Sequence, residues 1–198
     1  MRAMGTPAIH HPITPEEYLE QERKAEFRSE YVDGVVYEMS GGSYRHAVII
    51  SNVARSLGNS LEGSECAVVS SDMRVWIPAA KTFCYPDSLV ICGQPRFSGL
   101  RSDIVENPLL IIEVLSDSTE TYDRGQKFRK YRSIPDLRQY VLISQREPLV
   151  EVFTRDQQGF WLLREYAGLE STADLDAVQV LLPLQAIYQR VVFEPVTE

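Results

Sequence analysis

Apolar residues recur at two different spacings along this chain. Between Ser43 and Leu61 they fall three or four residues apart, which predicts a helix with one apolar face. An earlier helix, from about Pro15 to Lys24, is predicted by Thr14-Pro15-Glu16-Glu17, a capping box with proline at the first helical position. Asp33-Gly34 lies between the two helices and predicts the tight turn of a β-hairpin over Glu30 to Met39.

Strand spacing dominates the rest of the chain. The run from Leu109 to Leu115 is apolar except at Glu113, which is typical of a central strand covered on both faces. A third helix is expected to begin between Ser118 and Tyr122 and to end at Pro135, because proline cannot continue a helix. The other expected elements are strands at 66–70, 73–77, 85–91 and 138–143, a hairpin over 149–154 and 160–166, and a short helix at 184–188. The loop 93–107 has no interpretable pattern.

Composition limits the class of protein. The 198 residues fit one domain over 14–198, preceded by a tail over 1–13. Contents of 44% apolar and 24% charged residues are ordinary for a soluble protein, and no apolar run approaches the roughly 18 residues of a membrane span. The N-terminus lacks the hydrophobic core of a signal peptide. Three cysteines without a CxxC pair favour reduced thiols, so we expect a cytoplasmic protein with no membrane partner.

The net charge of −8 argues against a protein that holds nucleic acid by charge alone. Its distribution is uneven, however, because basic residues gather in the predicted third helix. We call this set the basic ridge, and it consists of Arg124, Arg129, Lys130 and Arg132. The ridge is a candidate DNA-binding surface that contacts phosphates, and a merely solvated helix face is the alternative.

Two carboxylates stand in buried strands, where an unpaired charge is costly. Asp87 heads the apolar run 88–91, and Glu113 interrupts the run 109–115. Such a pair, with the main-chain carbonyl of Val114, could bind Mg²⁺ or Mn²⁺, since these hard cations need few protein carboxylates. Two carboxylates about 4 Å apart repel by roughly 4 kcal/mol, so without a cation one of them should titrate high. Lys127 follows on a helix face shared with Asp123 and Tyr131.

Each residue also has a structural explanation. Asp87 could be a turn former, and Lys127 could be a solvent-exposed lysine whose replacement by alanine costs no more than about 0.5 kcal/mol. His46 could be a hydrogen-bonded core histidine. Glu30 could be a third acid near the metal or a surface partner of Arg28.

Taken together, these residues resemble a known family. The motifs, which span about Thr14 to Tyr188, are Glu30, Asp33-Gly34, His46, Tyr85-Pro86-Asp87, Asn107 to Ser116, Ser118-Thr119, Asp123, Lys127, Tyr131 and Ile134-Pro135-Asp136. They are similar to the Uma-type restriction endonuclease family of the PD-(D/E)XK nuclease superfamily. The superfamily's lysine would fall two residues after Glu113, where this chain has Leu115.

The resemblance implies a fold, an activity and roles for residues. The fold is α/β, with a restriction-endonuclease-like mixed central sheet, both N-terminal helices on one face and the third helix nearby. The activity is that of a Mg²⁺- or Mn²⁺-dependent DNA endonuclease, acting as a homodimer. Asp87 and Glu113 bind the metal, Lys127 replaces the missing lysine, Glu30 assists, and His46 contacts phosphate or holds the site together.

Two other functions stay open. A nuclease fold without activity could serve as a DNA-binding or protein-interaction module. An enzyme for small phosphoesters would turn over a diester without affinity for DNA.

Overall fold

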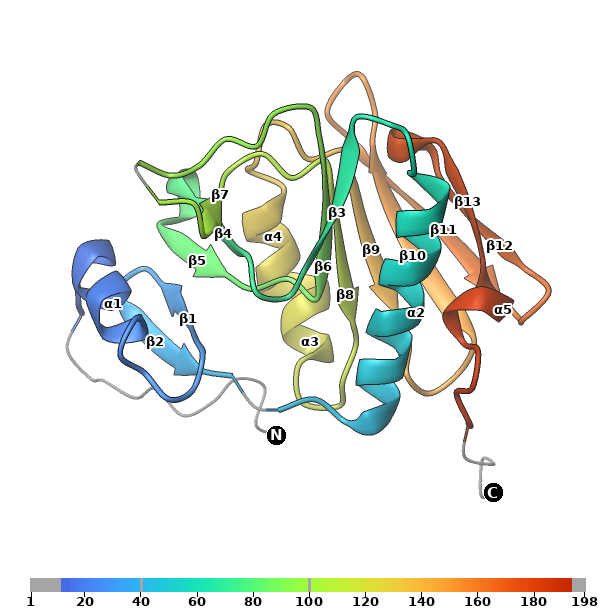
Figure 1. Cartoon of the computed structure of the whole chain (residues 1–198), viewed down its shortest axis with the longest axis horizontal. Coiled ribbons are helices and arrows are strands. Elements are labelled where there is room, and N and C mark those ends of the chain that lie inside the picture. The colour runs from blue at the N-terminus through green and yellow to red at the C-terminus, as the bar shows by residue number, and fades with distance from the viewer. Residues whose placement is uncertain (1–11, 40, 100, 194–198) are drawn as a thin grey trace.

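A six-stranded mixed sheet forms the centre of the computed structural model, which describes residues 12–39, 41–99 and 101–193 (Figure 1). The strand order is β11-β10-β9-β8-β6-β3, in which β8 and β9 are parallel and the other neighbours antiparallel. Helix α2 (Tyr44–Ser60) covers one face, and α3 (Glu120–Tyr122) with α4 (Phe128–Tyr131) covers the other. The strands are β3 (Cys66–Ser70), β6 (Ser88–Cys92), β8 (Leu110–Val114), β9 (Gln139–Ile143), β10 (Leu149–Arg155) and β11 (Trp161–Ala167).

Strand alternation in β8 assigns each side chain to one of these faces. Ile112 and Val114 belong to the core beneath α2, whereas Ile111 and Leu115 belong to the core beneath α4. Glu113 lies between Ile111 and Leu115 at strand spacing, so its carboxylate must emerge on the α4 face. The strand is fully buried, as its apolar run predicted.

A second, five-stranded sheet carries the N-terminal helix, in the order β2-β1-β5-β4-β7. Helix α1 (Pro15–Glu22) packs on it through Tyr18, which joins Tyr31 and Phe83 in a small aromatic core. The expectation that α1 and α2 share one face was therefore wrong, because these rings give α1 a core of its own. The strands are β1 (Ser29–Val32), β2 (Val35–Glu38), β4 (Arg74–Ile77), β5 (Thr82–Cys84) and β7 (Ile104–Val105).

The predicted N-terminal capping and turn are confirmed. The Thr14 hydroxyl accepts from the Glu17 backbone N–H at 3.2 Å, and the Glu17 carboxylate accepts from the Thr14 N–H at 2.7 Å. Asp33 and Gly34 take φ values of 43° and 94°, the left-handed pair that a two-residue hairpin turn requires. This turn aligns β1 with β2 and so fixes the position of Glu30.

The third helix is not a regular α-helix throughout. Residues Asp123–Lys127 between α3 and α4 form a π-helical segment, an insertion often found at functional sites. The C-terminal hairpin of β12 (Thr172–Leu175) and β13 (Val180–Pro183), followed by α5 (Leu184–Ile187), packs against the core beneath α2. We did not predict this hairpin, or the strand β7 within the loop 93–107. Short 3₁₀ turns occupy Pro78–Ala80 and Asp176–Val178.

Two of the three cysteines form a disulfide, which corrects the expectation of reduced thiols. Cys66 on β3 lies directly opposite Cys92 on β6, and strand pairing thereby brings together residues 26 positions apart. Cys84 is free and buried. Most of the predicted tail lies outside the described residues, but Ile13 already packs against the aromatic core of α1. Within the described ranges no helix is long and apolar enough to cross a membrane.

Gly34→Ala should lower the free energy of unfolding by at least about 1–2 kcal/mol, the cost of a left-handed conformation for a residue with a side chain. An added Cβ would also stand 2.9 Å from the Pro12 Cβ, too close without movement. Urea unfolding measures the loss. Gly63→Ala is the control, since Gly63 has a φ of 78° and open space around the added atom. Equal losses in both variants would contradict the packing of Pro12 on the hairpin.

Candidate active site

Asp87 and Glu113 lie side by side where β6 and β8 reach a cleft. Ser88 pairs with Ile112 across the two strands, so the next residues, Asp87 and Glu113, are cross-strand neighbours. The Asp87 Oδ2 accepts a hydrogen bond from the Val114 backbone N–H at 2.7 Å. The two acids predicted from sequence are therefore brought together.

Lys127 reaches the same point from the helix. Its Nζ lies 2.8 Å from the Glu113 Oε1, 3.3 Å from the Glu30 Oε1 and 3.6 Å from the Asp123 Oδ1. The side chain is only 7% exposed. The interpretation of Lys127 as a solvent-exposed lysine was wrong, because the π-helical segment turns it inward onto three carboxylates.

Further contacts fix the acids around this ammonium group. The Tyr131 hydroxyl donates to the Glu113 Oε1 at 2.9 Å, and the Tyr85 backbone N–H donates to the Glu30 Oε1 at 3.2 Å. The sequence put Asp123, Lys127 and Tyr131 on one face, but we had assigned no role to Asp123 or Tyr131. Their spacing of four and eight residues was the available signal. Glu30 comes from β1, so the second sheet contributes directly to the site.

The cluster holds three carboxylates around one ammonium group, and its pKa values reflect burial first and the surplus of negative charge second. Burial raises the pKa of Glu113 well above its usual range; Lys127 opposes this shift, and the charges of Asp123 and Asp87 add to it. Burial also raises the pKa of Asp123. For Lys127, burial alone would lower the pKa, but Glu113 and Glu30 outweigh it and raise the pKa. A cation would relieve this repulsion.

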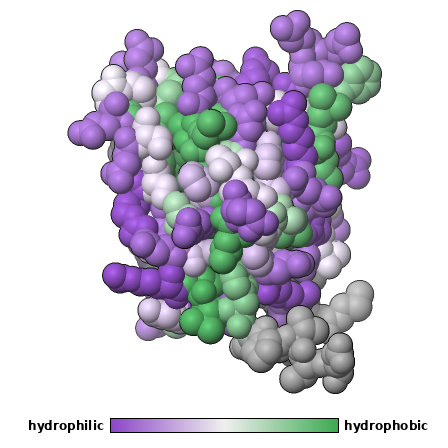
Figure 2. Space-filling view, turned by 90° about the vertical axis from the view of Figure 1, so that its right-hand side faces the viewer, coloured by the Kyte–Doolittle hydropathy of each residue, from purple (hydrophilic) through white to green (hydrophobic). Residues whose placement is uncertain are grey.

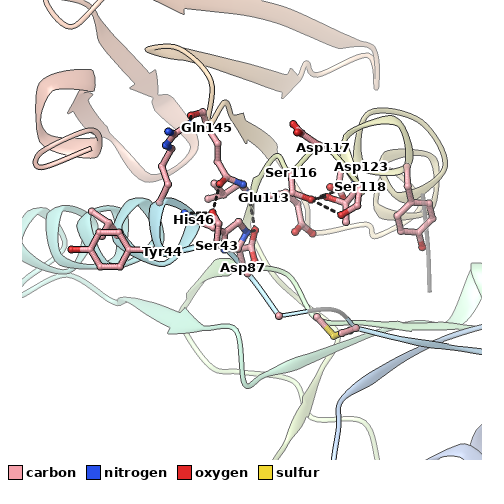
Figure 3. A pocket seen from close by; sticks show the side chains of 18 of the residues that line it. Ser43, Tyr44, His46, Asp87, Glu113, Ser116, Asp117, Ser118, Asp123 and Gln145 are labelled. Carbon is pink, nitrogen blue, oxygen red and sulfur yellow. Dashed lines mark hydrogen bonds and ion pairs between the residues drawn. The ribbon is translucent and has the colours of Figure 1, made fainter. Parts of the chain in front are cut away.

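His46 contacts the other acid. It lies in the first turn of α2, where Ser43 caps the helix by accepting from the His46 backbone N–H at 3.1 Å. Its Nε2 lies 3.2 Å from the Asp87 Oδ2 (Figure 3). Burial would lower the pKa of His46, but the hydrogen bond to Asp87, the charge of Asp87 and a hydrogen bond with the Val114 backbone together raise it. His46 therefore pairs with Asp87 as Lys127 pairs with Glu113.

The four residues of the basic ridge do not share one environment. Arg124 forms ion pairs with Glu120 at 2.9 Å and with the buried Glu151 at 2.5 Å. Lys130 donates to the Tyr122 hydroxyl at 2.9 Å. Arg132 lies over the Phe128 ring, and Arg129 is exposed. No member of the ridge is among the described residues that line the cleft.

The cleft itself is large and mixed in charge. Its volume is about 1320 Å³, above the roughly 300–1000 Å³ of a small-molecule site. Its walls come from β1, β2, the start of α2, the ends of β6 and β8, and the third helix. The acidic lining residues are Glu30, Glu38, Asp87, Glu113, Asp117 and Asp123, and the lysine and arginine residues are Arg45, Lys127, Arg146 and Arg190.

The donor atoms suit a hard divalent cation. No group of three or more His, Cys, Asp or Glu side chains at metal-binding distances occurs among the described residues. Mg²⁺ is often held by only one or two protein carboxylates together with water and substrate oxygens. Asp87, Glu113 and the backbone of Val114 offer oxygen atoms of the type that Mg²⁺ binds, and the surplus negative charge favours a cation there.

Comparison with known proteins adds family and fold. Residues 15–186 match the family described as "Uma2: Putative restriction endonuclease". The uncharacterized proteins slr1290 and sll1609 of Synechocystis sp. (strain ATCC 27184 / PCC 6803 / Kazusa) are each 34% identical; the matches cover 91% and 85% of this chain and 94% and 95% of theirs. A crystal structure titled as a putative nuclease belonging to DUF820, from Anabaena variabilis ATCC 29413, shares the fold: the TM-score is 0.73 at 18% identity, over 91% of this chain and 100% of that one. The predicted restriction-endonuclease-like α/β fold is confirmed.

Lys127→Ala should lower the free energy of unfolding at neutral pH by about 3–5 kcal/mol, because it leaves buried carboxylates without their cation. The folded state holds the pKa of Glu113 above its usual value, and losing Lys127 raises that pKa further. The folded state therefore binds more protons than the unfolded chain, so the deficit should shrink as the pH falls toward the usual carboxyl pKa. Urea unfolding at neutral and mildly acidic pH measures both effects.

Two variants complete that experiment. Glu113→Gln in the Lys127→Ala background should recover part of the loss, because it removes one of the unpaired charges. Lys130→Ala should cost much less, since within the described residues the recorded contacts of the Lys130 ammonium group are with the Tyr122 hydroxyl and ring and not with a carboxylate. A Lys127→Ala protein as stable as wild type at every pH would show that the ion pairs do not support the fold.

Proposed function

This chain belongs to the Uma2 putative restriction endonuclease family, and from that premise we propose that it is a metal-dependent DNA endonuclease that hydrolyses phosphodiester bonds. The observation that carries the proposal is the convergence of Asp87, Glu113 and Lys127 in one cleft, with 2.8 Å between the Lys127 Nζ and the Glu113 Oε1. Leu115, where the superfamily has its lysine, is buried. The helix supplies a lysine to the site in its place.

Each residue has a role that follows from its contacts. Asp87, Glu113 and the Val114 carbonyl would hold Mg²⁺ or Mn²⁺, which would stabilise negative charge on the phosphoryl oxygens. Lys127 orients the attacking water and adds positive charge beside the phosphate. Glu30, Asp123 and Tyr131 position Lys127 and Glu113. His46 holds Asp87 in place and lies close enough to the cleft to contact a phosphate oxygen.

The homodimer and the phosphate contacts are proposals as well. A double-strand cut needs two sites, which two copies of the chain would provide. Of the basic ridge, the exposed Arg129 and Arg132 would meet phosphates outside the cleft, because Arg124 is occupied by Glu120 and Glu151 and Lys130 by Tyr122. A cytoplasmic location stays a prediction, and the Cys66–Cys92 disulfide removes the support that cysteine usage gave to it.

Relaxation of supercoiled plasmid tests the nuclease. Wild-type protein should nick the plasmid with Mg²⁺ or Mn²⁺ and stop when the metal is chelated. Asp87→Asn and Glu113→Gln should each lose on the order of a hundredfold or more in rate, as expected when a preorganised charge-stabilising group is lost. Asp117→Asn is the matched control, because Asp117 lines the same cleft but is exposed and paired with Arg146.

The same assay separates this proposal from the non-catalytic alternative. A wild-type protein that binds DNA but never nicks it with either cation would exclude the nuclease. Activity that survives both substitutions would exclude this site. Turnover of a small chromogenic diester without cleavage of plasmid would indicate a phosphodiesterase for small substrates instead.

We propose that two copies of the chain meet at β11, one of the two edge strands of the central sheet in the described residues. Edge strands present free N–H and C=O groups, and β11 also exposes Leu162 and Leu163. Figure 2 shows the side of the molecule that carries α5 and the β12–β13 hairpin, where apolar surface is visible between hydrophilic side chains. Wild-type protein should sediment as a dimer, and Leu163→Lys should sediment as a monomer. A monomeric wild type, or a Leu163→Lys dimer of unchanged stability, would contradict this interface.

A further inference from the structure

Tyr44 lies at the entrance of the cleft with its ring in solvent. Tyr44 is 83% exposed and lines the same cleft as Asp87 and Glu113. Across the described part of the chain, its side chain makes no hydrogen bond and no ring contact. Two other cleft tyrosines are engaged, since the Tyr85 hydroxyl donates to Glu22 and the Tyr122 hydroxyl accepts from Lys130, and a third, Tyr37, is only partly exposed. Tyr44 is thus an aromatic surface free to receive a partner.

The backbone that carries this ring is held firmly. The neighbouring Ser43 hydroxyl donates to the Gln145 Oε1 at 2.7 Å, and Arg45 on the other side donates to the Gln145 carbonyl at 3.1 Å. Gln145 in turn donates to the Leu115 carbonyl at 2.6 Å. The first turn of α2 is therefore tied to β8 and β9, so little backbone freedom would be lost when a ligand stacks on Tyr44.

The charge of the cleft shows what kind of ligand this would be. Six acidic side chains against four lysine or arginine side chains line it, on a chain of net charge −8. Phosphate contacts alone, which hold most duplex binders, are weak here. Stacking of a base on an aromatic ring does not depend on positive charge and works for any base. It requires, however, a base that is not already stacked between its neighbours in a duplex.

The place of Tyr44 relative to the acids completes the argument. Tyr44 and His46 belong to the same helical turn, and the His46 Nε2 contacts Asp87 at 3.2 Å. In Figure 3 Tyr44 lies on one side of Asp87, and Ser118 and Asp123 lie on the other. Because Tyr44 lines the same cleft as Asp87 and Glu113, a base on its ring would belong to a strand that also passes these acids.

We propose that Tyr44 is a stacking platform for an unpaired nucleobase, and that the preferred substrate of the cleft is a DNA strand with at least one base out of the duplex. This substrate class rests on the nuclease proposed above. Single strands, and duplexes carrying a mismatch or a flap, meet the requirement, whereas a fully paired duplex does not.

Fluorescence anisotropy with a labelled oligodeoxynucleotide tests the platform without any cleavage, because the metal is chelated throughout. Wild-type protein should bind the single strand more tightly than the blunt duplex of the same sequence. Tyr44→Ala should weaken single-strand binding by roughly tenfold, in line with the loss of one base–aromatic stack. Duplex binding should stay unchanged. Tyr44→Phe and Tyr44→Trp should retain wild-type affinity, since they keep an aromatic face.

Phe27→Ala is the matched control, because Phe27 is 68% exposed and does not line the cleft; it should bind as wild type does. The inference is overturned if Tyr44→Ala binds the single strand as wild type does, or if it weakens single-strand and duplex binding equally. It is also overturned if Tyr44→Phe fails like Tyr44→Ala. Plasmid nicking that persists with an unchanged Tyr44→Ala affinity would refute the platform and leave the nuclease intact. Single-strand binding that depends on Tyr44, without any nicking of plasmid, would support the platform and refute the nuclease.

Discussion

The buried ion pair between Lys127 and Glu113, with 2.8 Å between the Nζ and the Oε1, lies where three parts of the fold meet. Glu113 belongs to the central sheet, Lys127 to the helix that covers it, and Glu30, which shares the ammonium group, to the second sheet. Removing two charges from water is costly, so such a pair rarely persists for stability alone. The negative charge of the surrounding carboxylates instead attracts cations to the site around Lys127 and Glu113.

The two faces of β8 have different surroundings, and this difference makes the arrangement possible. The α2 face holds an apolar core, and the α4 face is apolar except where Glu113 emerges. A sheet that is buried on both sides can hold a carboxylate rigidly, because its neighbours Ile111 and Leu115 cannot move away. The second sheet then closes the cleft from the side of β1. Rigid presentation of acids by strands and of the lysine by a helix is what a preorganised electrostatic site requires.

Sequence reasoning succeeded where the signal was local. The capping box at Thr14, the Asp33-Gly34 turn and the periodic run in α2 each depend on residues within a few positions of one another, and all three are confirmed. The family resemblance is likewise confirmed by the match over residues 15–186. Asp87 and Glu113 stood out because a carboxylate in an apolar strand is anomalous by itself.

The errors concern contacts between distant segments. Burial of Lys127 depends on Glu30, almost a hundred residues earlier, and on a π-helical segment that has no sequence signature. The disulfide depends on the register between β3 and β6, and the separate core of α1 on three aromatic rings from different elements. The β12–β13 hairpin was missed because Thr172–Leu175 is short and mixes polar with apolar residues without a turn signal that we recognised.

The π-helical segment also has a consequence for comparing related chains. Each residue of an α-helix advances about 100° around the axis, so one residue inserted or removed before Lys127 would rotate everything after it by that amount. Gly125, with open space around it, is a position where such a change could be accommodated. Relatives that differ in length here would carry their lysine on another side of the helix. A single-residue gap in an alignment of this segment therefore bears on whether an ammonium group can reach the carboxylates.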